Sequence, residues 1–240
     1  MFLVILTALG VGGATVAGAV IGFFFKDSSA RFGGTILAFS AGVMLAASVF
    51  GLIIPALESG RPYALVISLA GILCGAVCMD VLERLVTRLR PEAALHNKVM
   101  LFVAAIAIHN LPEGIAAGVG FGTSNPAGAL MIAGGIALQN IPEGMVIIGP
   151  MLTTGMSAGR TFLYALITGL IEVAGTFIGY FAVTLATAVL PFSLAFAGGT
   201  MLFIICGEMI PQTCCGECGK TASYSLLCGF CVMLALSVLL

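Results

Sequence analysis

This sequence has very few charged residues, and that shortage decides its class before any motif is considered. Only 8% of its 240 residues are Asp, Glu, Lys or Arg, whereas 60% are hydrophobic. Soluble domains carry about 25% charged residues, so the composition is typical of a membrane protein. With a net charge of −1, the chain also lacks the basic surface that nucleic-acid binding requires.

Long polar stretches are missing as well. No segment is polar enough to hold a separate soluble domain, so we expect residues 1–240 to form one membrane-embedded transporter domain. The opening Met1 to Ile5 lacks the basic residues that begin a cleavable signal peptide, and its apolar run continues to about Phe25. The eight cysteines do not indicate a disulfide-rich secreted protein, because the hydrophobicity excludes that class.

Apolar runs of membrane-spanning length are what the chain has instead. A spanning helix needs about 20 apolar residues, and charged or Pro/Gly-rich breaks divide the sequence into eight such runs. They cover residues 2–25, 32–57, 62–84, 99–122, 127–153, 159–186, 190–211 and 221–240. The longest connection is the polar stretch 84–98. The sequence therefore predicts an all-α membrane protein with eight transmembrane helices.

The distribution of basic residues predicts how these helices are oriented. Lys and Arg are enriched in cytoplasmic loops, and an even number of helices places both termini on one side. If both termini lie outside, eight of the nine basic residues fall in cytosolic loops, and only Arg61 falls on the other side. We therefore expect a multi-pass protein of a plasma or bacterial inner membrane with both termini extracytoplasmic.

Two segments far apart in the chain resemble each other. Residues 38–45 read AFSAGVML and residues 195–202 read AFAGGTML, and their helices end near Pro55 and Pro211. The two helices are five apart, so they cross the membrane in opposite directions, which is the pattern of an inverted-topology repeat. We therefore expect helices one to three and six to eight to form the repeat around a central pair, helices four and five.

That central pair carries a doubled motif. The sequences HNLPEG and QNIPEG begin at His109 and Gln139, 30 residues apart. Each opening residue shares a helix face with the glutamate four positions later, Glu113 or Glu143. Each proline leaves a carbonyl of the preceding turn without its helical donor. Imidazole, carboxylate and amide oxygens suit Zn²⁺ and its neighbours in the transition series, so the spacing predicts a metal site shared by the two helices.

Carboxylates inside the apolar runs also favour a functional role. Each costs about 2.5–3.5 kcal/mol to insert, and four are present: Glu113, Glu143, Glu172 and Glu208. A divalent cation bridging Glu113 and Glu143 would neutralise two of these charges. Glu208 either lines a path for the ion or lies at the membrane interface, and the sequence leaves both open. Asp80 and Glu83, close to basic residues, are interpreted as interfacial charges.

The doubled motif, the helix with Glu172 and the segment FAGGTM resemble the ZIP (Zrt/Irt-like) metal transporters. The likeness extends over essentially the whole chain and is greatest to the bacterial GufA-like branch, in which Gln opens the second motif. The resemblance implies a binuclear metal centre between helices four and five. Its first site would comprise Met44, His109, Glu113, Gln139 and Glu143, and its second Asn110, Glu113, Asn140, Glu143 and Glu172.

The resemblance also implies a function and a mechanism. ZIP proteins import metal towards the cytosol, often as homodimers, and an elevator-like sliding of helices two, four, five and seven is implied. We therefore expect a carrier of divalent transition-metal ions, Zn²⁺ first and also Cd²⁺, Fe²⁺ and Mn²⁺, as substrates rather than catalytic cofactors. A selective channel and a membrane metal sensor remain alternatives. We expect no enzyme, since the HExxH arrangement of intramembrane metalloproteases is missing.

Three thiols lie close together after the seventh predicted helix. Cys214, Cys215 and Cys218 fall within five residues, and the last two have the CxxC spacing of metal sites. They either receive soft metal ions that leave the transporter or are incidental thiols in a flexible loop. The sequence does not decide between these readings.

Overall fold

The computed structural model of the chain describes residues 1–26, 29–88, 94–122, 126–153, 155–185, 189–214 and 219–239. Within these ranges the chain forms helices and turns and no strand. The helices are α1 (Phe2–Phe24), α2 (Ala30–Ala46), η1 (Ala47–Ile53), α3 (Ile54–Leu57), α4 (Ala64–Arg88), α5 (Ala94–Gly120), α6 (Pro126–Thr153), α7 (Ala158–Leu185), α8 (Leu190–Ile204), η3 (Ile205–Met209), α9 (Ile210–Cys214) and α10 (Gly219–Leu239). The segments η1 and η3 are π-helical.

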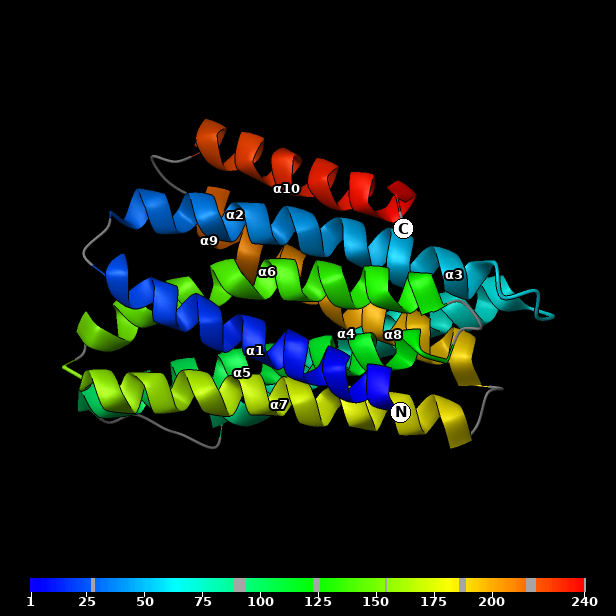
Figure 1. The fold of residues 1–240 in the computed structure, drawn as a ribbon, viewed down its shortest axis with the longest axis horizontal. Coiled ribbons are helices and arrows are strands. Elements are labelled where there is room, and N and C mark those ends of the chain that lie inside the picture. The colour runs from blue at the N-terminus through cyan, green and yellow to red at the C-terminus, as the bar shows by residue number, and fades with distance from the viewer. Residues whose placement is uncertain are drawn as a thin grey trace.

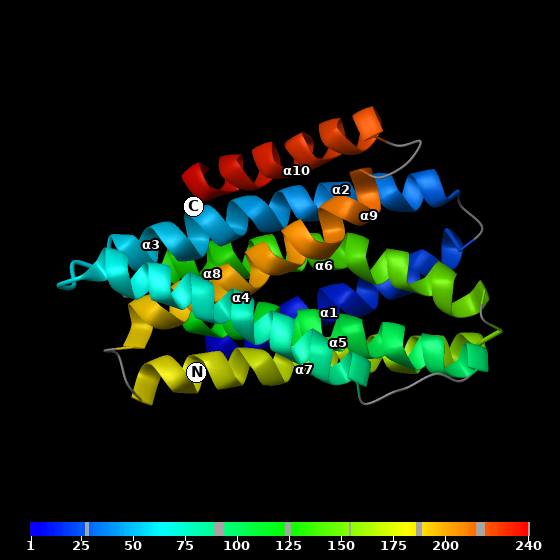
Figure 2. The same ribbon diagram turned by 180° about the vertical axis from the view of Figure 1, so that it is seen from behind.

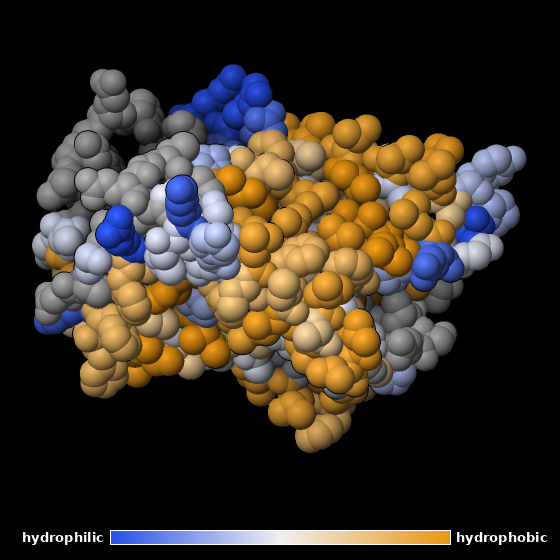
Figure 3. All heavy atoms as spheres, turned by 90° about the horizontal axis from the view of Figure 1, so that it is seen from above, coloured by the Kyte–Doolittle hydropathy of each residue, from blue (hydrophilic) through white to orange (hydrophobic). Residues whose placement is uncertain are grey.

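Seven segments of the described chain are long and apolar enough to cross a membrane. They are Phe2–Phe24, Arg31–Leu57, Ala64–Leu85, Pro126–Thr153, Ala158–Leu185, Leu190–Thr213 and Gly219–Leu239. The remaining long helix, α5, has 27 residues, and its side chains are described from Ala107 onward. Hydrophobic side chains cover the middle of the molecule and hydrophilic ones gather towards its two ends (Figure 3). The expected all-α membrane architecture is therefore confirmed.

The helices on either side of the expected polar connection are longer than predicted. Helix α4 continues to Arg88 and α5 already begins at Ala94, so much of the stretch 84–98 is helical. Arg, Leu, Ala and Lys are good helix formers in any solvent. Charge therefore marks where the apolar run ends, and the helix itself extends beyond that point.

Two long helical rods, α2–η1–α3 and α8–η3–α9, each contain a π-helical turn, and the two turns occupy corresponding positions. Helix α2 passes through η1 into α3, and α8 passes through η3 into α9. Each π segment stops one residue before an Ile-Pro pair, at Pro55 or at Pro211. Proline has no backbone N–H, so the helical ladder must be rearranged around it, and single π turns in α-helices are common at functional sites.

The helices pack as two groups. Helices α1, α5, α6 and α7 pack extensively on one another, whereas α2 packs on α10 and α4 on α8 (Figures 1 and 2). Glycines bring the backbones together: a Cβ at Gly118 of α5 would collide with Thr176 of α7, and one at Gly42 with Leu226 of α10. The two groups meet mainly where α2 contacts α6 and α8 contacts α5.

Candidate metal centre

The two motifs lie where helices approach most closely. Helices α5 and α6 continue through Pro112 and Pro142, so each motif stays on a continuous helix. A Cβ on the motif glycine of α5, Gly114, would collide with the backbone of Glu172 on α7. Only a residue without a side chain fits there, and the adjacent Glu113 is thereby held next to α7.

The two motifs are joined by a direct hydrogen bond. Gln139 Nε2 of α6 donates to Glu113 Oε1 of α5 at 2.9 Å. Both side chains are buried, with Gln139 0% and Glu113 1% exposed. A charged acceptor makes this bond stronger than one between neutral groups. The structure therefore brings together the two motifs that the sequence placed on neighbouring helices.

Glu172 is the most heavily bonded of the carboxylates. Its Oε1 accepts from Asn110 Nδ2 at 2.8 Å and from Asn140 Nδ2 at 2.9 Å. Its Oε2 accepts from Thr15 Oγ1 of α1 at 2.9 Å. One buried network of four side chains thus ties together α1, α5, α6 and α7. The sequence did not single out Thr15, because a threonine in a membrane helix has no distinguishing pattern.

The second motif glutamate, Glu143, is less enclosed. It is half-buried, and its Oε1 accepts a hydrogen bond of 2.8 Å from Ser40 Oγ of α2. Gln139 and Asn140, which bond to Glu113 and Glu172, lie within five residues of Glu143 on α6, so the three carboxyl groups form one cluster. Neutral amides and hydroxyls donate hydrogen bonds to the carboxyl groups of this cluster. Among the described residues, no hydrogen bond from Lys or Arg to the cluster is found.

Three oxygens of the cluster have no hydrogen-bond partner among the described residues. They are Glu113 Oε2, Gln139 Oε1 and Asn140 Oδ1, all buried. Buried acceptors normally find a donor, and leaving one unpaired costs about 1–3 kcal/mol. Unpaired carboxylate and amide oxygens are groups that a cation satisfies and an apolar core does not.

His109 is directed to a different place from the one expected. Its Nε2 lies 3.3 Å from Glu208 Oε1 of η3, outside hydrogen-bond geometry. Ligand atoms of Glu83, His109 and Glu208 all lie within 4.8 Å of one another. Among the described residues this trio is the one group of three or more His, Cys, Asp and Glu side chains compact enough to hold a metal ion. Glu83, which the sequence indicated as an interfacial charge, thus lies close to His109 and Glu208.

Comparison with known proteins shows the family to which the chain belongs. A family model described as ZIP Zinc transporter matches residues 88–237. The chain is 36% identical to the zinc transporter GufA of Myxococcus xanthus, with 98% of this chain and 97% of that protein covered. The chain belongs to the ZIP family. It is also 35% identical to the zinc transporter ZIPB of Bordetella bronchiseptica, with 95% of this chain and 78% of that protein covered. The resemblance in the motifs is thereby confirmed.

Met44 of this ZIP protein packs in the apolar core. It is fully buried in the main apolar core, and its backbone carbonyl accepts from Ser48 Oγ at 2.7 Å. A thioether is at most a weak acceptor, so it needs no partner in an apolar environment. Cys215, Cys218 and the side chain of Cys214 lie outside the described residues.

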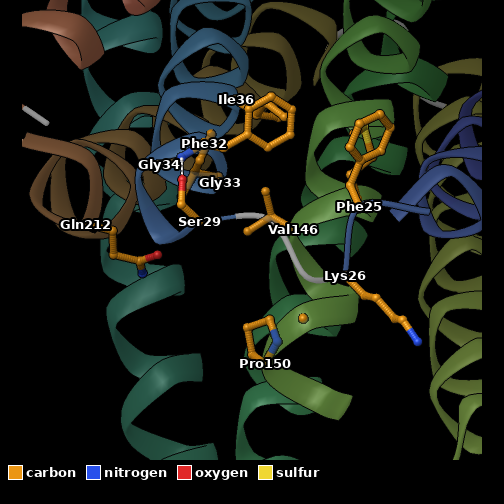
Figure 4. Close-up of a pocket in the computed structure, with 13 residues that line it drawn as sticks. Phe25, Lys26, Ser29, Phe32, Gly33, Gly34, Ile36, Val146, Pro150 and Gln212 are labelled. Carbon is orange, nitrogen blue, oxygen red and sulfur yellow. Dashed lines mark hydrogen bonds between the residues drawn. The ribbon is translucent and has the colours of Figure 1, made fainter. Parts of the chain in front are cut away.

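A cavity of about 290 Å³ opens between the start of α2 and the second half of α6. Figure 4 shows residues of both helices around it, among them Ile36 and Val146, with Lys26 at its edge. Ile36 comes one helical turn before Ser40, and Val146 follows Glu143 by three residues. The cavity in this ZIP chain therefore approaches the half-buried Glu143 from one end of the bundle.

Proposed function

We propose that this protein carries divalent transition-metal ions, Zn²⁺ first among them, into the cytosol through a binuclear site between α5 and α6. The observation that carries the proposal is the cluster of Glu113, Glu143 and Glu172 with its unpaired buried oxygens. The family membership supports transport as the activity, since the relatives are named zinc transporters. Cd²⁺, Fe²⁺ and Mn²⁺ are further proposed substrates, because carboxylate, amide and imidazole ligands accept all four.

The charge of the cluster supports an ion as its natural occupant. Glu113 and Glu172 are buried among apolar helices, and their hydrogen-bond donors are neutral. Neutral donors orient a carboxylate but do not cancel its charge. A divalent cation between Glu113 and Glu143 offsets two negative charges at once, which lowers the desolvation cost of both.

We propose two ion positions in this site. The first uses His109, Glu113, Gln139 and Glu143, with Met44 on the neighbouring rod. The second uses Asn110, Asn140 and Glu172 together with the two motif glutamates. In the empty protein the amides of Gln139 and Asn140 present N–H groups to carboxylates. Each amide ligates through its oxygen, which is unpaired here, so its N–H group keeps its hydrogen bond to a glutamate while the oxygen binds an ion.

The membrane topology that we propose has eight spans, α5 included, and an inverted repeat. Thr15 and Glu172, which are hydrogen-bonded, are 157 residues apart. The same offset relates Gly12 to Gly169 and Gly42 to Gly199. Gly12 and Gly169 face each other across α1 and α7, so the proposed repeat axis passes close to the carboxylate cluster. The paired π turns before Pro55 and Pro211 support the same relation.

The orientation proposed from the basic residues fits the arrangement of the helices. Both termini lie at the same end of the bundle in Figure 1. The connections at the opposite end are flanked by Lys26, Arg31, Arg84, Arg88, Arg160 and Lys220, whereas Arg61 lies in the α3–α4 connection. Since basic residues favour the cytoplasmic side, that basic end is the proposed cytosolic end.

The packing of the helices supports an elevator-type carrier, but the set of helices proposed to move differs from the one expected. The expectation from the resemblance was that helices two, four, five and seven slide together. Helices α5 and α6 instead pack most extensively with α7 and α1, and the Glu172 network joins all four. We therefore propose α1, α5, α6 and α7 as the unit that carries the ion. The trio Glu83, His109 and Glu208 is its proposed release point, because His109 belongs to both groups of ligands.

Metal uptake into proteoliposomes tests the proposal. Purified wild-type protein, Glu143→Ala and the control Glu58→Ala are compared over Zn²⁺, Cd²⁺, Fe²⁺ and Mn²⁺. Glu58 is an exposed glutamate in the turn after α3, so its replacement keeps the charge count of Glu143→Ala without touching the cluster. Wild type and Glu58→Ala should show saturable uptake that Glu143→Ala lacks. Tight metal binding to wild type with no uptake would contradict a carrier and indicate a sensor.

A further inference from the structure

A serine on α2 contacts one of the proposed ion ligands. Ser40 Oγ donates to Glu143 Oε1 at 2.8 Å across the boundary between the two helix groups. Ser40 is completely buried, and it lies four residues before Met44, so both residues are on one face of α2. A small hydroxyl among the alanines and glycines of a membrane helix gives no sequence pattern that marks it.

We infer that Ser40 is a positioning residue of the transport site, which holds one oxygen of Glu143 so that the other faces the ion. The inference rests on the proposed function. Carboxylates that bind metal are generally held by hydrogen bonds from outside the ligand set, and loss of such a partner lowers metal affinity or activity about 10- to 100-fold.

Glu143 depends on this serine more than Glu172 depends on any one partner. Glu172 accepts hydrogen bonds from three side chains. Among the described residues, Ser40 is the one side chain that donates to Glu143. Glu143 is also only half-buried, and Met145 and Val146, which follow it on α6, line the cavity of Figure 4. Removal of the Ser40 hydroxyl therefore frees the Glu143 side chain to leave its ion-binding orientation.

The position of Ser40 also suits a site that fills and empties. Its Oγ lies 3.0 Å from the backbone carbonyl oxygen of Gln139 as well. A hydroxyl has one hydrogen, so it donates to either oxygen but not to both. When the Glu143 side chain turns away from Ser40, the hydroxyl turns to the Gln139 carbonyl and stays hydrogen-bonded. The site thus exchanges an ion without leaving a buried hydroxyl unpaired.

Three variants test the inference: Ser40→Ala, Ser40→Thr and the matched control Ser48→Ala. Ser48 is equally buried in the same rod, but its hydroxyl bonds to Met44 O of its own helix at 2.7 Å. Cd²⁺ binding to purified protein is measured by titration calorimetry, and Zn²⁺ uptake in proteoliposomes. Ser40→Ala should raise the Cd²⁺ Kd and the Zn²⁺ KM about 10- to 100-fold with a nearly unchanged maximal rate. Ser40→Thr should restore both constants, and Ser48→Ala should match wild type.

Two results would overturn the positioning role while the transport function stands. One is saturable uptake by wild type with Ser40→Ala binding Cd²⁺ equally well. The other is an equal loss of affinity in Ser40→Ala and Ser48→Ala, which would indicate a packing effect. Absence of uptake by wild type would instead refute the proposed function, and with it this inference.

Discussion

The molecule holds two groups of acidic side chains that differ in their surroundings. The central cluster of Glu113, Glu143 and Glu172 is compensated by neutral amides and hydroxyls, and Glu113 is 1% exposed. In the trio of Glu83, His109 and Glu208, which come from α4, the middle of α5 and η3, the side chains of His109 and Glu208 are 17% and 31% exposed. Here an imidazole lies close to the carboxylates, and the partly exposed side chains are less completely desolvated than those of the central cluster.

This difference indicates that the two groups of side chains serve different steps, ion binding and ion release. A cluster that is buried and lacks a cationic partner gains most from a bound ion, so it suits selective binding. A partly exposed trio gains less from an ion and is expected to release it more easily. His109 stands between the two, four residues before Glu113 and 3.3 Å from Glu208. Variants that affect one cluster and spare the other separate binding from release.

The largest expected effect follows loss of a central ligand. Glu113→Ala removes the carboxylate that pairs with Gln139 and faces both other glutamates. We expect Zn²⁺ uptake to fall to the level of protein-free vesicles and Cd²⁺ binding in calorimetry to be lost. Glu83→Ala, in the trio, serves as the comparison and should retain Cd²⁺ binding. Equal loss of binding in both variants would refute the distinction between the clusters.

A large effect on stability is expected at the glycine behind the central cluster. In Gly114→Ala the new Cβ collides with the Glu172 backbone, so α5 and α7 must separate. Overpacking of this kind costs about 1–3 kcal/mol. Thermal unfolding in detergent, followed by circular dichroism, should show a lower Tm. Gly10→Ala, where nothing lies within 4 Å of the added Cβ, is the control and should keep the wild-type Tm.

A moderate effect is expected in the trio. Glu208→Gln keeps the size of the side chain but removes the negative charge that faces His109. If the trio releases ions, the maximal rate of Zn²⁺ uptake should fall several-fold while Cd²⁺ affinity stays close to wild type. Rate and affinity are separated by measuring uptake over a range of Zn²⁺ concentrations. A raised KM at an unchanged maximal rate would place Glu208 in the binding step instead.

The smallest effect is expected next to the trio, at Asp80. Its carboxylate pairs with Arg84 one turn away, and the two side chains are 38% and 68% exposed. Exposed pairs of this kind contribute about 0–1 kcal/mol. Asp80→Asn should therefore leave both Tm and Zn²⁺ uptake unchanged within error. A marked loss of uptake would extend the ion path to this residue.

Motif spacing predicted the centre of the site better than its edges. HNLPEG and QNIPEG on neighbouring helices predicted the meeting of Glu113 and Gln139, because four-residue spacing and short connections restrict the geometry. The direction of the His109 ring depends on Glu83 and Glu208, which are 125 residues apart and come together only through packing. Binuclear binding by the eight predicted ligands stays a prediction.

The prediction of the fold from the sequence was limited in the same way. Apolar run length predicted the positions of the helices, because the bilayer sets that length. The π turns before Pro55 and Pro211 were not predicted, since an i→i+5 turn has no composition of its own. Ser40 and Thr15 were missed for a similar reason: a hydroxyl becomes significant only through the carboxylate that packs beside it.

The most direct test of the central claim is the position of a bound ion. Crystals of the protein with Cd²⁺ would be examined for anomalous scattering, in wild type and in Glu143→Ala. The account predicts a peak within ligand distance of Glu113 and Glu143 in wild type that disappears in the variant. A peak only among Glu83, His109 and Glu208, unchanged by the substitution, would contradict a transport site between α5 and α6.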